Sequence, residues 1–261
     1  MVLAIDVGNS ITAVGLFTQE GKLVFRSELT TNCRSTRDQC AVSLMDVFRI
    51  YGADIQSVTG AIISSVVPSV TGAISEAVTL LTGNIPLITG PGVKTGLNIK
   101  SDIHTQMGSD IVAYSVGAAA KYPTPLIVVE MGTAITISVL LGNVYEGCII
   151  MPGVQVALDA LSERAAGLPQ ISIQPPPSIL GHNTVDAMRS GVIYGNASMV
   201  DGMIDRLEAD IGPASSLVGT GSAAPDILPY CRHHLIYDPN LLLDGLYLLY
   251  QKNTVKKARR G

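Results

Sequence analysis

Residues 6–10 combine the residue types that bind phosphate groups. Asp6 ends a short apolar run, Gly8 follows it, and Asn9 and Ser10 add short polar side chains. Gly8 has no Cβ, so a ligand can approach its backbone closely, and N–H groups that converge in such a turn bind anions. Asp6 is suited to hold Mg²⁺ through water. The stretch predicts a phosphate-binding hairpin, although an ordinary β-hairpin with turn-forming residues explains it equally well on its own.

The same pattern returns about half a chain later. An apolar run at residues 126–129 ends in Glu130, and Gly132-Thr-Ala134 follows. Two further strand-like runs come after each pattern, so chance is a poor explanation for both. A third strand-to-glycine turn, at residues 217–222, is suited to backbone contact with a nucleoside or a phosphate. The repeats predict two similar α/β halves whose hairpins face one another across a cleft.

Apolar patterning places the elements that carry these turns. Residues 2–5, 11–17 and 23–29 are typical of an antiparallel meander, and residues 61–67 of a buried parallel strand. Asp110 lies at the start of an apolar helix that runs to about residue 121. Such a position projects a carboxylate from a helix N-terminus and keeps it ionised. A plain helix-start carboxylate is nevertheless the stronger interpretation of Asp110 from the residues alone.

Two helices carry more specific expectations. Ser35 or Thr36 is suited to cap a helix through about residue 51, with an apolar stripe of Val42, Met45 and Phe48-Arg49, and Gly52 closes it. A long helix from 185 to about 209 is expected to break or kink near Gly191 and Gly195, and the final helix begins at residue 241.

Composition narrows the classes of function. The chain has 261 residues, 47% of them hydrophobic and 15% charged, and a net charge of −4. These values predict a globular protein and argue against nucleic acid as the main partner. No apolar stretch approaches the roughly 20 residues of a membrane helix, so no membrane partner is expected. The four cysteines lack metal-type spacing and are typical of free thiols in the cytoplasm.

The chain resembles the type III pantothenate kinases nearly end to end. The motifs that carry this resemblance are Asp6-Val-Gly8-Asn9-Ser10, residues 90–96, Gly108-Ser-Asp110, Gly132-Thr-Ala134, Pro152-Gly153, Asn183-Thr184, residues 187–191, Asp201-Gly202 and Asp238-Pro239. The resemblance implies a duplicated ribonuclease H-like α/β fold, as in actin-like ATPases, with two domains around a nucleotide cleft. The first domain would comprise residues 1–116 with the C-terminal helix at 241–261, and the second would comprise residues 117–240. It also implies a homodimer packed through the second domain.

The resemblance further implies that the chain phosphorylates pantothenate with ATP and Mg²⁺, the first step of coenzyme A synthesis. Asp110 matches the catalytic base. The ATP-binding positions are Asp6, Val7, Gly8, Asn9, Ser10, Ile11, Thr12, Ala13 and Thr133. The substrate-binding positions are Gly108, Ser109, Asp110, Ile111, Thr184 and Ser101. Glu130 matches the ligand of a monovalent cation, K⁺ or NH₄⁺.

Three positions depart from the pattern of the family. Ile111 stands where the family has arginine, Ser101 where it commonly has tyrosine, and Glu130 where it has aspartate. An arginine binds a carboxylate through two hydrogen bonds, whereas isoleucine offers no charge and no donor. Pantothenate carries a carboxylate, so we expect weak binding of this substrate unless Lys94 or Arg189 compensates.

The departures gather at acceptor positions and largely spare the ATP segment. That asymmetry leaves a second hypothesis, a nucleotide-binding homologue with altered or absent kinase activity that acts as a regulator. A kinase for another small alcohol is a third, and an actin-like filament protein is more remote. Asp110 discriminates between kinase and regulator, because a nucleotide sensor has no need of a base there.

Overall fold

The computed structural model describes residues 1–100 and 107–254, which divide into two compact units. The first unit comprises residues 1–97, 107–120 and 240–254, and the second comprises residues 98–100 and 121–239. Residues 240–254 therefore group with the unit that contains the N-terminus. The predicted domains, 1–116 with the C-terminal helix and 117–240, stay a prediction.

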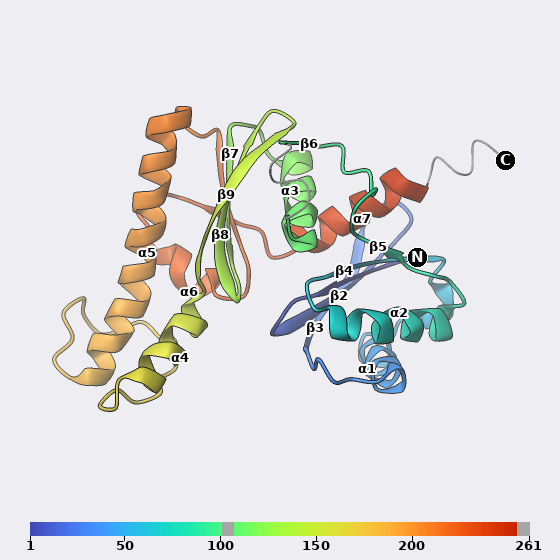
Figure 1. The fold of residues 1–261 in the computed structure, drawn as a ribbon, viewed down its shortest axis with the longest axis horizontal. Helices are drawn as coiled ribbons and strands as arrows, with labels where there is room; N and C mark the ends of the chain where they lie inside the picture. The colour runs from blue at the N-terminus through green and yellow to red at the C-terminus, as the bar shows by residue number, and fades with distance from the viewer. Residues whose placement is uncertain (101–106, 255–261) are drawn as a thin grey trace. The chain divides into compact units, whose positions relative to one another are not determined.

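The first unit is built on a five-stranded sheet in the order β3-β2-β1-β4-β5 (Figure 1). Strands β1, β2 and β3 form the predicted antiparallel meander, and β4 and β5 continue the sheet in parallel with β1. The five strands are β1 (Val2–Val7), β2 (Ile11–Phe17), β3 (Leu23–Thr30), β4 (Gly60–Ser65) and β5 (Leu87–Ile88).

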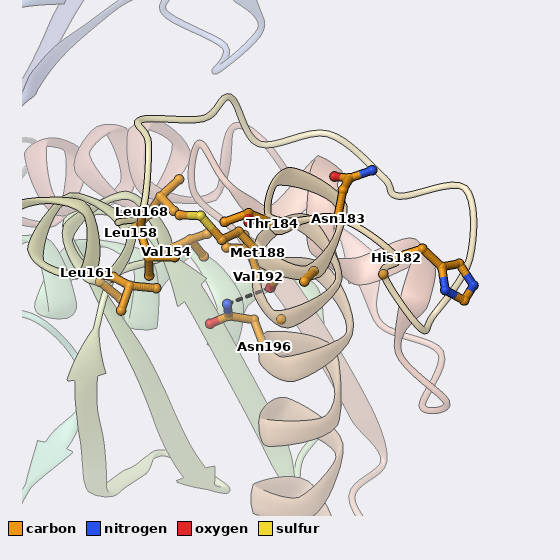
Figure 2. Close-up of a pocket in the computed structure, with 14 residues that line it drawn as sticks. Val154, Leu158, Leu161, Leu168, His182, Asn183, Thr184, Met188, Val192 and Asn196 are labelled. Atoms are coloured by element: carbon orange, nitrogen blue, oxygen red, sulfur yellow. Dashed lines mark hydrogen bonds between the residues drawn. The ribbon is translucent and has the colours of Figure 1, made fainter. Parts of the chain in front are cut away.

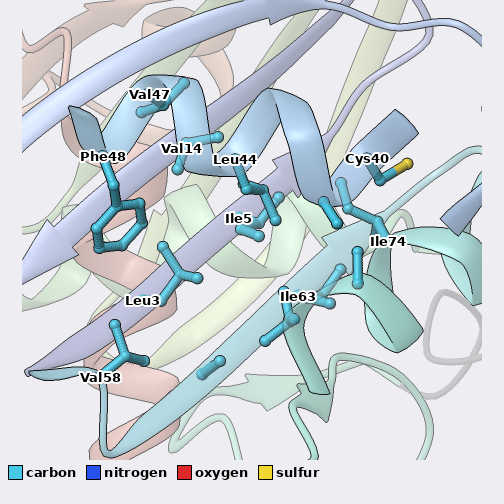
Figure 3. Close-up of a cluster of buried hydrophobic side chains, with 14 of the residues drawn as sticks. Leu3, Ile5, Val14, Cys40, Leu44, Val47, Phe48, Val58, Ile63 and Ile74 are labelled. Carbon is cyan, nitrogen blue, oxygen red and sulfur yellow. The ribbon is translucent and has the colours of Figure 1, made fainter. Parts of the chain in front are cut away.

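Four α-helices cover the two faces of this sheet: α1 (Arg37–Ile50), α2 (Pro68–Thr82), α3 (Ser109–Lys121) and α7 (Leu241–Thr254). Successive residues of β1 point to opposite faces. Leu3 and Ile5 pack with α1 and α2, as Figure 3 shows for Leu44 and Phe48 of α1. Val2 and Ala4 instead pack with α3 and α7. Burial on both faces explains why β1 is apolar throughout rather than alternating.

Helix α1 begins where it was predicted but buries a different face. Thr36 is its N-cap, and Thr36 and Gln39 form a capping box. The predicted stripe was wrong in part: Phe48 is buried, but Val42 and Met45 are 61% and 44% exposed. The buried positions are Cys40, Ala41, Leu44, Val47 and Phe48, which also recur at helical spacing.

The second unit repeats the topology of the first. Its sheet has the order β11-β10-β7-β8-β9-β6, so β9-β8-β7-β10-β11 matches β3-β2-β1-β4-β5. In both units three antiparallel strands are continued by two parallel ones. The fold is the predicted duplicated α/β fold. Its strands are β6 (Asn98–Ile99), β7 (Leu126–Met131), β8 (Ala134–Leu141), β9 (Val144–Pro152), β10 (Ser216–Thr220) and β11 (Ile236–Tyr237).

The helices of the second unit are α4 (Val154–Arg164), α5 (Thr184–Ile211) and the short α6 (Ala224–Ile227). Helix α5 runs as one helix of 28 residues, so it does not break near Gly191 and Gly195, and the alternative of a kink there stays a prediction. Each glycine costs about 1 kcal/mol relative to alanine. Burial of Ile193 and Val200 against the sheet core offsets that cost. Among the described residues, no helix has the length and apolarity required to cross a bilayer.

Candidate functional site

The first glycine turn lies between β1 and β2, as predicted. The Gly8 N–H donates to the Ile11 carbonyl oxygen at 3.0 Å, and a Cβ on Gly8 would lie 2.9 Å from that oxygen. The turn is therefore closed too tightly for a side chain at this position. Asn9, Ser10 and Ile11 are exposed, whereas Asp6 and Val7 behind them are buried. Exposed backbone N–H groups can bind an anionic ligand, and the buried carboxylate behind them can attract a cation that is bound to that ligand.

Asp6 is buried to a degree that is unusual for a carboxylate. Its side chain is 8% exposed, and its Oδ1 has no hydrogen-bond partner in the described residues. Burial raises the pKa of Asp6 to about 7, a hydrogen bond with Ser64 lowers it in part, and the nearby charge of Asp110 raises it further. A buried carboxylate with an unpaired oxygen is costly unless a cation or water satisfies it. The donor therefore fits Mg²⁺ held through water.

Asp110 lies in the first turn of α3, within the same unit as Asp6. It is half-buried, and burial raises its pKa, while hydrogen bonds from the backbone N–H groups of Ile111 and of Asp110 itself lower it in part. Gly108 precedes the helix, and a Cβ there would overlap Asp110 Oδ1. A side chain at position 108 would therefore force the Asp110 carboxylate to shift. The structure brings the predicted base and the phosphate hairpin together.

The remaining predicted acceptor positions differ in their surroundings. Ile111 is 8% exposed, so its side chain belongs to the apolar packing of α3. The Ser109 hydroxyl contacts Ser64 Oγ at 2.9 Å. Ser101 lies outside the described residues. Thr184 is the first residue of α5 in the second unit, where Asn183 caps the helix by accepting the Asp186 N–H at 2.9 Å.

The second hairpin has the same strand pairing as the first, but its turn is one residue shorter: Met131 pairs with Ile135, whereas Val7 pairs with Thr12. Glu130 stands at the end of β7 and pairs in register with Thr220 of the parallel strand β10, as Asp6 pairs with Ser64 of β4. The Gly132 N–H donates to the Ala134 carbonyl oxygen at 2.9 Å, and a Cβ on Gly132 would lie 2.5 Å from Glu130 Oε1. The longer acid therefore occupies space that only glycine leaves open.

Two further glycines converge on this second hairpin. A Cβ on Gly153 would overlap the carbonyl oxygens of Gly132 and Thr133, and the Gly153 N–H donates to Thr133 at 3.1 Å. Gly221 has a φ of +96°, and a Cβ on it would lie 2.5 Å from the Met131 carbonyl oxygen. The backbones at Gly132, Gly153 and Gly221 therefore lie against one another with no side chain between them, and such a surface suits close approach of phosphate groups. The glycine turn at residues 217–222 was predicted. The packing of Gly153 on the second hairpin was not, although a glycine directly after β9 was its signal in the sequence.

A cavity of about 720 Å³ lies in the second unit between α4 and α5. Figure 2 shows Val154, Leu158 and Met188 on its walls and Thr184 at its edge. The walls are mainly apolar. Among residues 1–100 and 107–254, no group of three or more His, Cys, Asp or Glu side chains is arranged to hold a metal ion.

Comparison with known proteins agrees with these features. A family model described as type III pantothenate kinase matches residues 2–206. A type III pantothenate kinase from Halalkalibacterium halodurans is 37% identical over 254 residues, which cover 97% of this chain and 100% of the relative. Another, from Bacillus cytotoxicus, is 35% identical over 262 residues and covers 100% of both chains. Component A of (R)-2-hydroxyglutaryl-CoA dehydratase from Acidaminococcus fermentans has a TM-score of 0.58 at 14% identity, covering 99% of each chain, and shows a shared fold.

Proposed function

The chain belongs to the type III pantothenate kinase family, and we propose that it transfers the γ-phosphoryl group of ATP to the primary hydroxyl of pantothenate, giving 4′-phosphopantothenate for coenzyme A synthesis. The observation that carries this proposal at the level of the site is the pair Asp6 and Asp110. Both carboxylates belong to the first unit, Asp6 is buried and Asp110 half-buried, and the charge of Asp110 raises the pKa of Asp6.

Asp110 is the proposed general base. Phosphoryl transfer requires little covalent chemistry from the protein, so positioning and removal of the acceptor proton are the main tasks. Burial raises the pKa of Asp110, and a base whose pKa lies nearer to the working pH accepts a proton more readily. Its carboxylate would take the proton from the pantothenate hydroxyl as that oxygen attacks the γ-phosphorus.

The hairpin at residues 6–13 is proposed to hold the phosphates. Backbone N–H groups of the exposed turn would contact them, and Thr133 is proposed to contribute from the second hairpin. Asp6 would hold Mg²⁺ through water, as its unpaired Oδ1 fits. When bound, Mg²⁺ supplies positive charge that neutralises the phosphate oxygens. Glu130 is the proposed ligand of K⁺ or NH₄⁺.

The acceptor carboxylate needs a cation other than residue 111, since Ile111 offers none. Lys94 is exposed. Arg189 is the other candidate: its side chain is 25% exposed, its Nε has no partner among the described residues, and its Nη1 lies 3.9 Å from Asp186 Oδ1. We expect a high KM for pantothenate unless one of these two residues takes this role.

We also propose a homodimer, which the apolar surface of the second unit supports. Val156 and Leu161 of α4 are each 44% exposed, and Leu161 also lines the 720 Å³ cavity. Light scattering after gel filtration should report twice the mass of one chain, and Leu161→Asp should lower it towards the mass of one chain. A wild-type protein that elutes as a monomer at micromolar concentration contradicts this proposal. A cytoplasmic location stays a prediction.

The test of the kinase is ATP-dependent ADP release with and without pantothenate. Pantothenate should stimulate release by the wild type, and Asp110→Asn should lose the stimulation while still binding ATP by calorimetry. ATP binding without turnover in the wild type would refute the pantothenate kinase and favour the regulator. Turnover only with other small alcohols would identify a different acceptor.

A further inference from the structure

We propose that Ser64 and Ser109 are positioning residues for this reaction. Their hydroxyl groups join the end of β4 to the first turn of α3 and thereby hold Asp110 in place beside Asp6. The inference rests on the proposed kinase function and adds two residues to it. Ser109 lies within the segment expected to bind substrate, so its role as a contact to the protein rather than to pantothenate is a distinct claim.

The contacts form a continuous chain within the first unit. Ser64 Oγ lies 2.9 Å from Ser109 Oγ, and Ser109 Oγ donates to the Ser65 carbonyl oxygen at 3.2 Å. Ser64 is fully buried and stands in register with Asp6 on the neighbouring strand. Its hydroxyl also hydrogen-bonds the Asp6 carboxyl. Ser64 has a single hydroxyl proton, so at any moment it donates either to Ser109 Oγ or to the Asp6 carboxyl, and rotation of the hydroxyl exchanges the two.

This chain attaches the helix at the residue directly before the base. Ser109 is the first residue of α3 and Asp110 the second. The segment that leads into α3 includes Gly108, which permits a wide range of backbone conformations. A contact between side chains helps to fix the start of the helix. Ser109 Oγ accepts the Ser64 hydroxyl and donates to the Ser65 carbonyl oxygen, so two hydrogen bonds join it to β4.

Loss of this attachment should act on the chemical step. A displacement of about 1 Å at a catalytic group lowers the rate by up to roughly a hundredfold. We expect Ser109→Ala and Ser64→Ala each to lower kcat by about tenfold to a hundredfold, with KM for ATP and for pantothenate changed by less than about threefold. A direct substrate contact from Ser109 predicts the opposite pattern, a raised KM for pantothenate with kcat retained.

The experiment is steady-state kinetics on a double-mutant cycle. If the two hydroxyls act as one unit, Ser64→Ala combined with Ser109→Ala should be no slower than the worse single variant. Ser109→Thr retains a hydroxyl and should restore kcat to within about threefold of the wild type. Ser43→Ala, on the exposed face of α1, is the matched control.

Each outcome decides a separate point. Additive effects, an unchanged kcat in Ser109→Ala, or a failure of Ser109→Thr to recover would overturn the positioning role. If an alanine variant loses cooperative thermal unfolding, the test uses Ser109→Thr against the wild type instead, because threonine keeps the hydroxyl. A wild type without pantothenate-dependent ADP release refutes the proposed function itself, and coupling of Ser64 and Ser109 in thermal unfolding then tests the bridge alone.

Discussion

Asp6→Asn should stabilise the ligand-free protein at high pH while removing its activity. Burial raises the pKa of Asp6 to about 7 from 3.8. Between these values the folded protein binds a proton that the unfolded chain has released, so stability falls as pH rises through this range. This loss of folding stability is absent below pH 3.8 and complete above pH 7. A difference of about three pKa units corresponds to about 4 kcal/mol, which is the most the variant can recover.

The measurement is urea unfolding of both proteins at pH 4 and pH 8 in the presence of a chelator. The chain has no tryptophan, so circular dichroism is the suitable signal. The stability gained by Asp6→Asn should be near zero at pH 4 and between about 1 and 4 kcal/mol at pH 8. Asp46→Asn, on the exposed face of α1, should show no such change.

The same variant should also respond less to bound ligands. Mg²⁺ and ATP should stabilise the wild type more than Asp6→Asn, because a bound cation favours the ionised carboxylate. If the stability gained by Asp6→Asn over the wild type is instead the same at pH 8 and at pH 4, that result would refute the claim that the ionised carboxylate at position 6 destabilises the fold.

Two further predictions concern the glycine cluster and the acceptor position. Gly153→Ala should destabilise the protein by about 1–3 kcal/mol and raise KM for ATP, because its Cβ would overlap the Gly132 and Thr133 carbonyls, whereas Gly167→Ala, with no atom within 4 Å, should do neither. Equal effects of the two substitutions in thermal unfolding and kinetics would contradict this account. Ile111→Arg should destabilise the protein, because Ile111 is 8% exposed, and in the folded variant it should lower KM for pantothenate at least tenfold with KM for ATP unchanged, because a guanidinium binds the carboxylate through two hydrogen bonds. An unchanged KM would show that another residue holds the carboxylate.

The elements predicted from local patterns were the most reliable. The meander, the repeated hairpin at Glu130, the helix cap at Thr36 and the end of α1 just before Gly52 all depend on residues within a few positions of one another. Their physics is contained in the local chain, so one sequence suffices. The duplicated fold followed because the same local pattern occurred twice.

What the sequence could not predict depends on distant contacts. Ser64 and Ser109 are 45 positions apart, and nothing near either residue indicates that their hydroxyls meet. The same applies to the face of α1, where Val42 and Met45 are as apolar as the residues that are buried. Only packing against the sheet decides between two apolar stripes on one helix.

The duplication gives a physical reason to assign different tasks to the two hairpins. Asp6 and Glu130 occupy equivalent positions, each beside a hydroxyl residue on the neighbouring parallel strand. Asp6 is buried with an unpaired oxygen, whereas Glu130 is half-buried and lies over Gly132. The shorter acid is held behind its turn, where it can act on a cation in front of it, while the longer acid reaches forward over its own turn. One topology thus provides two carboxylates that differ in side-chain length and burial, on turns that differ by one residue in length.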